Sequence, residues 1–105
     1  MASRIELEVA HDLPIEEAHA RMLALGEYYH HRHGAVVTWA DHQGDIAVRY
    51  LGIKLHVRVL VEARRVHCEA PDPGFLLRKR GIEYLRKKIA RYLDPATAVD
   101  ALPRR

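Results

Sequence analysis

The stretch that decides the fold is IKLHVRVLVE, residues 53–62, in which apolar and polar side chains alternate. A period of two places successive side chains on opposite faces of a β-strand. The pattern therefore predicts a strand that buries one face against a core and leaves the other exposed. The apolar residues expected on the buried face are Ile53, Leu55, Val57, Val59 and Val61.

Shorter β-rich segments lie on both sides of this strand. They read RIELEV at 4–9, AVVTWA at 35–40, IAVRYL at 46–51 and RVHCEA at 65–70. The four strands between residues 35 and 70 are joined by short connections. Short connections favour antiparallel pairing of neighbouring strands, so these four strands should form a meander.

Two amphipathic helices complete the predicted order of elements. The first runs from about residue 15 to 32, where apolar residues recur every three or four positions, and Gly34 should end it as a left-handed cap. The second runs from about residue 75 to 93 and is stopped by Asp94 and Pro95.

The resulting order is β-α-β-β-β-β-α, which predicts an α+β domain. Its simplest packing is one curved antiparallel sheet with both helices on one face. A sheet that grips the C-terminal helix would be a reduced version of the helix-grip fold. We expect residues 1–95 to form this single domain and residues 96–105 to form a flexible C-terminal tail.

Charge is distributed unevenly along the 105 residues, whose net charge is +3. Residues 1–52 hold four basic residues against eight acids, and residues 53–105 hold thirteen against six. An anionic partner should therefore bind the second half of the chain.

The second helix carries the first candidate binding surface. At 100° per residue, Arg80, Lys87 and Arg91 lie opposite the apolar stripe, with Tyr84 and Lys88 beside them. Such a helix can bind an anionic surface or nucleic acid phosphates, or it can simply be a solvated outer face. Arg78 falls on the apolar stripe and is a candidate pocket residue.

The face of the sheet opposite the core is the second candidate. Arg49, Lys54 and Arg58 project from it, together with other basic side chains of the same strands. The pattern predicts a broad basic surface if no helix covers this face, or the ordinary wet face of an antiparallel sheet. An exposed sheet could also be the surface of a homodimer.

Catalytic and metal-binding signatures are scarce. His30, His31 and His33 are too poorly spaced for a strong site, because residues i and i+1 of a helix do not converge. They should form a solvated last helical turn, with weak metal binding left open. Cys68 is the single cysteine and should be a small inward residue. We predict a non-enzymatic protein without a cofactor or a dedicated metal site.

Three stretches carry a resemblance to a known family. They are IELEVAHDLPIEEA at 5–18, LGIKLHVRVLVEARRVHCEA at 51–70 and FLLRKRGIEYLRKKIARYLD at 75–94. With the predicted order of elements, residues 4–94 resemble the polyhydroxyalkanoic acid system protein family, small bacterial proteins of polyhydroxyalkanoate granule gene regions. The resemblance implies an association with polyester storage granules and carries no catalytic residues.

Three functional hypotheses follow. The first is a protein that binds a polyhydroxyalkanoate granule, or a granule-associated protein, through basic and apolar surfaces. The second is a module that binds a small acyl-like ligand, with Arg78 near the polar end of its cavity. The third is a nucleic-acid-binding protein that uses the basic C-terminal half. The sequence has no apolar run of membrane-spanning or leader-peptide length, so we expect a cytoplasmic protein.

Overall fold

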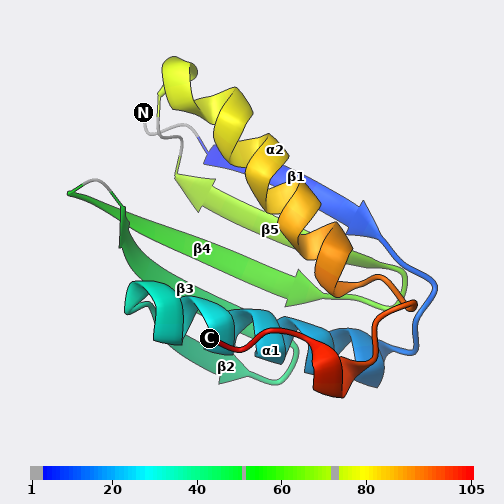
Figure 1. Ribbon diagram of the computed structural model, residues 1–105. Helices are drawn as coiled ribbons and strands as arrows, with labels where there is room; N and C mark the ends of the chain where they lie inside the picture. The colour runs from blue at the N-terminus through cyan, green and yellow to red at the C-terminus, as the bar shows by residue number, and fades with distance from the viewer. Residues whose placement is uncertain (1–3, 51, 72–73) are drawn as a thin grey trace.

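The computed structural model describes residues 4–50, 52–71 and 74–105. In this part of the chain five strands and two α-helices follow the order β-α-β-β-β-β-α, which confirms the predicted order (Figure 1). Their bounds are Arg4–Ala10 for β1, Ile15–His33 for α1, Val36–Ala40 for β2, Gln43–Tyr50 for β3, Ile53–Val61 for β4, Arg65–Pro71 for β5, Phe75–Tyr92 for α2 and Val99–Ala101 for a short 3₁₀ helix, η1.

The strands form one antiparallel sheet in the order β1-β5-β4-β3-β2. From β2 to β5 each strand pairs with the next along the chain, as the predicted meander requires. β1 pairs with β5, which brings Glu8 opposite His67 and Leu7 opposite Cys68. The α+β class and the single open sheet are confirmed.

Both helices cover the same face of the sheet. α2 lies over β1, while α1 contacts β2, β3 and β4 beside it (Figure 1). Among the described residues β4 pairs with β5 between residues 58–61 and 66–69, and Figure 1 shows the two strands diverging beyond that stretch. The half of the sheet under α2 and the half under α1 therefore splay apart at one end.

The core lies between the sheet and the two helices. In β1, Ile5, Leu7 and Val9 are buried while Glu6 and Glu8 between them are exposed, as the alternation predicts. The largest fully buried side chains come from both helices and from β5, and they are Tyr92, Met22, Ile89 and Val66. Side chains thus fill the interior where sheet and helices meet.

The central strand β4 follows the same alternation, with burial that changes along its length. Val59 and Val61 are buried, whereas Leu55 and Val57 are only half-buried. The difference follows from the splay, because the half-buried pair lies where β4 leaves β5. The side chain of Ile53 falls outside the described part of the structure.

Gly34 ends α1 in the predicted left-handed conformation, with φ 68° and ψ 22°. Its backbone N–H donates to the His30 carbonyl at 3.0 Å, and the next N–H, of Ala35, donates to the Tyr29 carbonyl at 3.2 Å. These two bonds satisfy carbonyls that the helix end would otherwise leave without a partner. The chain then turns directly into β2.

Residues 99–104 correct the prediction of a flexible tail. Leu102 is 4% exposed and belongs to the core. The Tyr92 hydroxyl donates to the Pro103 carbonyl at 2.6 Å, and Arg104 Nε lies 3.3 Å from a carboxylate oxygen of Glu27 on α1. After α2 ends, the chain therefore returns to α1 (Figure 1). Contacts with the domain extend beyond the predicted boundary at residue 95.

No helix in the described residues combines the length and the apolar character needed to cross a membrane.

Candidate functional site

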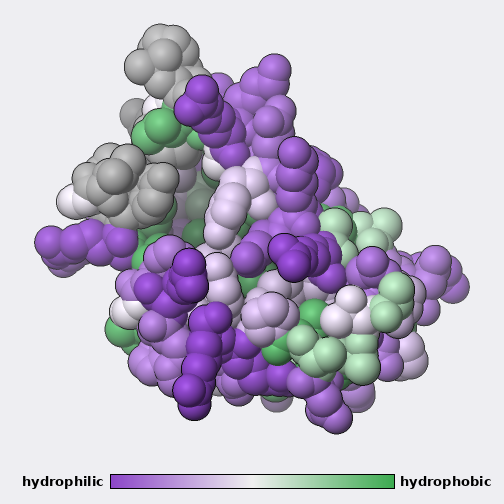
Figure 2. All heavy atoms as spheres, in the orientation of Figure 1, coloured by the Kyte–Doolittle hydropathy of each residue, from purple (hydrophilic) through white to green (hydrophobic). Residues whose placement is uncertain are grey.

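The outer surface of α2 carries the most concentrated basic charge of the molecule. Arg80, Lys87 and Arg91 are exposed, as predicted, and Lys79 and Arg86 flank them. Figure 2 shows hydrophilic residues over most of this helix. Between residues 75 and 92 the only acid is Glu83. Among the described residues, Lys79, Arg80, Lys87 and Arg91 have no carboxylate within ion-pair distance.

Arg78, the candidate pocket residue, is exposed. Its helical position matches the buried stripe, yet all residues from Leu77 to Arg80 are exposed. The N-terminal end of α2 extends past the strands that the rest of the helix covers (Figure 1). A side chain there can match the spacing of the apolar stripe and still be exposed.

Tyr84 and Lys88 connect α2 to α1. The Tyr29 hydroxyl donates a hydrogen bond to the Tyr84 hydroxyl at 3.1 Å. Lys88 Nζ lies 4.1 Å from the centre of the Tyr28 ring, a cation–π distance. Burial, followed by this hydroxyl contact, raises the pKa of Tyr29 well above its ordinary value. Lys88 is half-buried, so of these two predicted surface residues only Tyr84 stays largely accessible.

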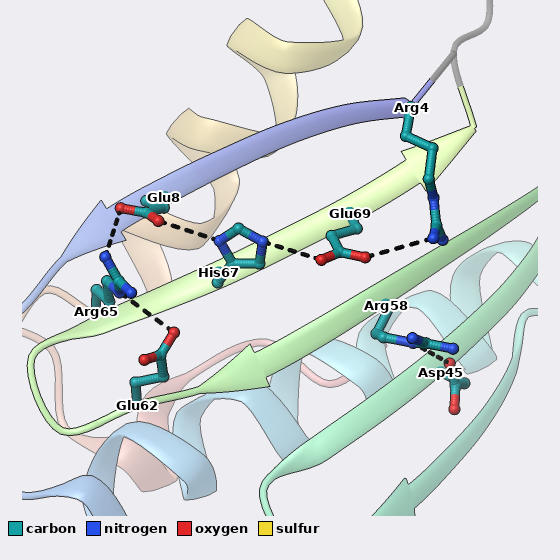
Figure 3. Close-up of polar contacts among 8 residues, drawn as sticks. All are labelled: Arg4, Glu8, Asp45, Arg58, Glu62, Arg65, His67 and Glu69. Carbon is teal, nitrogen blue, oxygen red and sulfur yellow. Dashed lines mark hydrogen bonds and ion pairs between the residues drawn. The ribbon is translucent and has the colours of Figure 1, made fainter. Parts of the chain in front are cut away.

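The outer face of the sheet carries an ion-pair network, which favours the alternative of an ordinary wet face over a broad basic surface (Figure 3). His67 lies between two carboxylates, with Nδ1 3.2 Å from Glu8 and Nε2 3.3 Å from Glu69. Arg65 lies 3.1 Å from Glu8, and Arg4 lies 3.7 Å from Glu69. The network arises because β1, which is rich in glutamate, pairs with β5. Acidic and basic groups therefore alternate over the β1–β5 part of this face.

The three predicted basic residues of this face differ in their surroundings. Arg58 Nε lies 3.6 Å from Asp45, so its charge is partly neutralised (Figure 3). Arg49 and Lys54 are exposed and lie directly opposite each other in the β3–β4 register. Two like charges thus remain at one end of the face. A homodimer through this face stays a prediction.

The helix-end histidines are exposed, as predicted for a solvated last turn. His30 Nδ1 donates to the Ala35 carbonyl at 2.9 Å, which occupies one of its ring nitrogens. The rings of His30 and His31 lie edge to face with centres 5.0 Å apart. In the described part of the chain, no group of three ligand atoms close enough for a metal ion includes these residues.

A different histidine cluster was not predicted from the sequence. Glu16 and His19 on α1 meet His42 in the turn between β2 and β3, and one ligand atom from each lies within 4.8 Å of the other two. The spacing of Glu16 and His19 places them on one helical face, which the sequence could have indicated. The approach of His42 depends on how α1 docks on the β2–β3 hairpin, which no local pattern reveals.

Open hollows indent the described surface, and two of them lie beside the helices. One of about 400 Å³ lies between the end of β1 and the end of α2, and one of about 360 Å³ lies between α1 and β2. Neither is lined by Arg78, the residue that the acyl-ligand hypothesis places at the polar end of a cavity. These two hollows therefore give the acyl-ligand hypothesis no support at Arg78.

Cys68 is buried in β5, as its inward strand position predicts. Burial raises the pKa of its thiol from 9.0 to about 12. Because the thiolate is the nucleophile of cysteine chemistry, a buried thiol with this pKa is poorly suited to react.

No protein-family model, no curated protein and no solved structure matches this chain. The resemblance to the polyhydroxyalkanoic acid system family therefore depends on the quoted sequence stretches alone.

Proposed function

We propose that this chain is a non-catalytic binding protein that attaches through α2 to an apolar body with an anionic surface. One observation carries the proposal. Lys79, Arg80, Lys87 and Arg91 on the outside of α2 have no ion-pair partner among the described residues, whereas Arg4, Arg58 and Arg65 on the outer sheet face are each paired with a carboxylate. Unpaired cations are the ones available to an anionic partner.

The arrangement of these side chains favours a partner with an extended anionic surface over a partner that is a single polyanionic chain. Leu77, Arg80, Tyr84, Lys87 and Arg91 follow one another at spacings of three and four residues, which places them along one helical face. Leu77 is 39% exposed and Tyr84 is 49% exposed. Apolar and aromatic side chains beside cations suit the boundary between an apolar interior and charged head groups.

The family resemblance suggests which body this is. A polyhydroxyalkanoate granule has an apolar polyester interior, and its surface would present the boundary that α2 suits. A protein with this role would work in the cytoplasm, where such granules form, and would need neither a cofactor nor catalytic residues. An anionic membrane also has an apolar interior and a charged surface, so the experiment must distinguish binding to granules from binding to membranes.

Co-sedimentation tests the proposal with three particles: isolated polyester granules, phosphatidylglycerol vesicles and phosphatidylcholine vesicles. We expect the protein to sediment with granules at about 50 mM salt and to be released at about 500 mM, because surface electrostatics are screened. The triple variant Arg80→Glu, Lys87→Glu and Arg91→Glu should bind about 100-fold more weakly, since each cation near an anionic surface contributes about 1 kcal/mol. Leu77→Ser should weaken binding to a smaller extent.

The matched control changes the same charge elsewhere. Arg32, Arg49 and Lys54 are exposed and lie outside α2, so the triple Arg32→Glu, Arg49→Glu and Lys54→Glu should retain binding. Binding to phosphatidylglycerol vesicles but not to granules would replace the granule by a membrane. A protein that stays in the supernatant with every particle, or equal loss in both triples, overturns the proposal. Binding of duplex DNA through α2 without particle binding would favour the nucleic-acid hypothesis.

A further inference from the structure

Glu16, His19 and His42 form a second place where the molecule can bind a ligand. Glu16 lies in the first turn of α1, His19 one turn later, and His42 between β2 and β3. One ligand atom from each lies within 4.8 Å of the other two. The cluster is separate from the basic surface of α2, and the proposed function makes no use of it.

His19 has a buried nitrogen without a partner. Its Nε2 is shielded from solvent and makes no hydrogen bond in the described structure. The ring is held edge to face between Trp39 and His42, with centre distances of 5.0 and 4.8 Å. A buried nitrogen without a hydrogen bond destabilises the fold unless a further group binds it. A metal ion bound at Nε2 would satisfy it.

The other two groups are already spaced as metal ligands. His42 Nε2 lies 3.0 Å from Glu16 Oε1. In a tetrahedral zinc site with bonds of about 2.0 Å, neighbouring ligand atoms lie about 3.3 Å apart. The backbone carbonyl of His42 accepts a hydrogen bond from the Val61 N–H at 2.9 Å, which fixes this residue to β4. An ion could therefore take the place of the proton that Glu16 and His42 share.

The geometry points to a divalent transition-metal site of the zinc class at Glu16, His19 and His42. Two imidazoles and one carboxylate suit zinc, cobalt or nickel, whereas calcium and magnesium prefer oxygen ligands. The Glu16 side chain is 77% exposed, so a fourth position would open to solvent and accept water. The site is on the outside of the fold and could hold an ion without opening the core.

A second cluster in the described residues, Glu6, His67 and Glu69, is a weaker candidate. Both ring nitrogens of His67 already have carboxylate partners, and Glu69 also contacts Arg4. A metal there would have to displace the contacts of His67 with Glu8 and Glu69 and of Glu69 with Arg4, whereas an ion at the first cluster would displace the Glu16–His42 contact and gain the unpartnered Nε2 of His19. This contrast supplies a control.

The experiment titrates the untagged full chain, stripped with a chelator, with zinc chloride by calorimetry. We expect one equivalent to bind with Kd at or below about 10 μM. Cobalt should give the intense visible absorption of a tetrahedral ion, and magnesium should give no heat. Glu16→Gln and His42→Ala should each weaken zinc binding at least about tenfold. Glu16 is exposed, so its variant keeps the proposal testable if substitutions of the histidines unfold the chain.

Two control variants locate the ion. The double variant His30→Ala and His31→Ala removes exposed helix-end imidazoles, and His67→Ala removes the competing cluster. Both should retain the Kd of the unsubstituted chain. Zinc binding weaker than about 10 μM, or binding that either control abolishes while Glu16→Gln leaves it unchanged, overturns the assignment.

Discussion

The guanidinium of Arg21 donates a hydrogen bond to the backbone carbonyl of Tyr92 at 3.0 Å, which ties the middle of α1 to the last residue of α2. The same Nη1 donates to the Asp94 carbonyl at 3.0 Å, and Nε lies 3.5 Å from Glu17. Arg21 is 3% exposed. Arg21 thus places a positive charge at the C-terminal end of α2, where it also complements the negative end of that helix's dipole.

Arg21→Ala should lower the free energy of unfolding by about 2–4 kcal/mol, because it removes charge-assisted bonds and leaves the buried Tyr92 carbonyl without its Arg21 donor. Urea denaturation monitored by circular dichroism measures the change. Arg32→Ala removes an exposed arginine from the same helix and should have almost no effect. Equal stabilities of the two variants would contradict the role of Arg21.

Gly44 leaves room for the ring of Trp39 on the neighbouring strand. The two residues are opposite each other in the β2–β3 register, and a Cβ at position 44 would lie 2.9 Å from two atoms of the indole ring. Gly44→Ala should therefore displace the ring and lower the unfolding free energy by about 1–3 kcal/mol. Trp39 is the single tryptophan, so its fluorescence spectrum should shift in the folded state. An unchanged spectrum together with unchanged stability would contradict this packing.

Gly81, unlike Gly44, has room for a side chain, because a Cβ at position 81 would meet open space. It lies inside α2, where glycine costs about 0.5–1 kcal/mol relative to alanine. Gly81→Ala should raise the melting temperature by about 3–6 °C. Thermal scans measure it directly, and a lower melting temperature would mean that position 81 needs the freedom of glycine.

Leu102 attaches the C-terminal segment to the core. Leu102→Ala should lower the unfolding free energy by about 2–4 kcal/mol, since it removes a buried side chain that contributes to the main cluster. Denaturant titration checks this. The exposed Leu77 provides the control, and its alanine variant should change stability by less than about 0.5 kcal/mol. Equal, small effects would restore the interpretation of residues 96–105 as a flexible tail.

The order of elements could be predicted because alternation and helical spacing are local signals. The strand β4, the helix cap at Gly34 and the inward position of Cys68 all follow from short stretches. The tail could not be predicted in the same way. Leu102 is the single large apolar residue in ALPRR, and one such residue produces no periodicity.

The features of the candidate sites that the sequence could not predict depend on contacts between residues far apart in the chain. Alternation indicates that Glu8 and Arg65 both point away from the core, but their 3.1 Å contact depends on the pairing of β1 with β5. The spacing of Glu16 and His19 is local, whereas the arrival of His42 depends on tertiary docking. The basic surface of α2 could be predicted, because helical spacing alone shows which side chains of a helix lie opposite its apolar stripe.

The buried thiol of Cys68 makes stability depend on pH in the alkaline range. The folded chain keeps the thiol proton up to about pH 12, while the unfolded chain releases it near the ordinary pKa of 9.0. Between these values the unfolded state binds fewer protons, so the free energy of unfolding falls as pH rises. From about pH 8 to about pH 10.5 the loss due to this thiol should be about 2 kcal/mol.

Cys68→Ala isolates this contribution. Burial also raises the pKa of Tyr29 and of Tyr92, but both tyrosines are present in the variant, so their effect cancels when the two pH profiles are subtracted. Urea denaturation across the alkaline range should show the steeper decline in the chain that carries Cys68. A disulfide reagent at about pH 8 should also label the native thiol far more slowly than the unfolded one, since reactivity follows the thiolate. Parallel pH profiles, together with rapid native labelling, would mean that solvent reaches the thiol in the folded state.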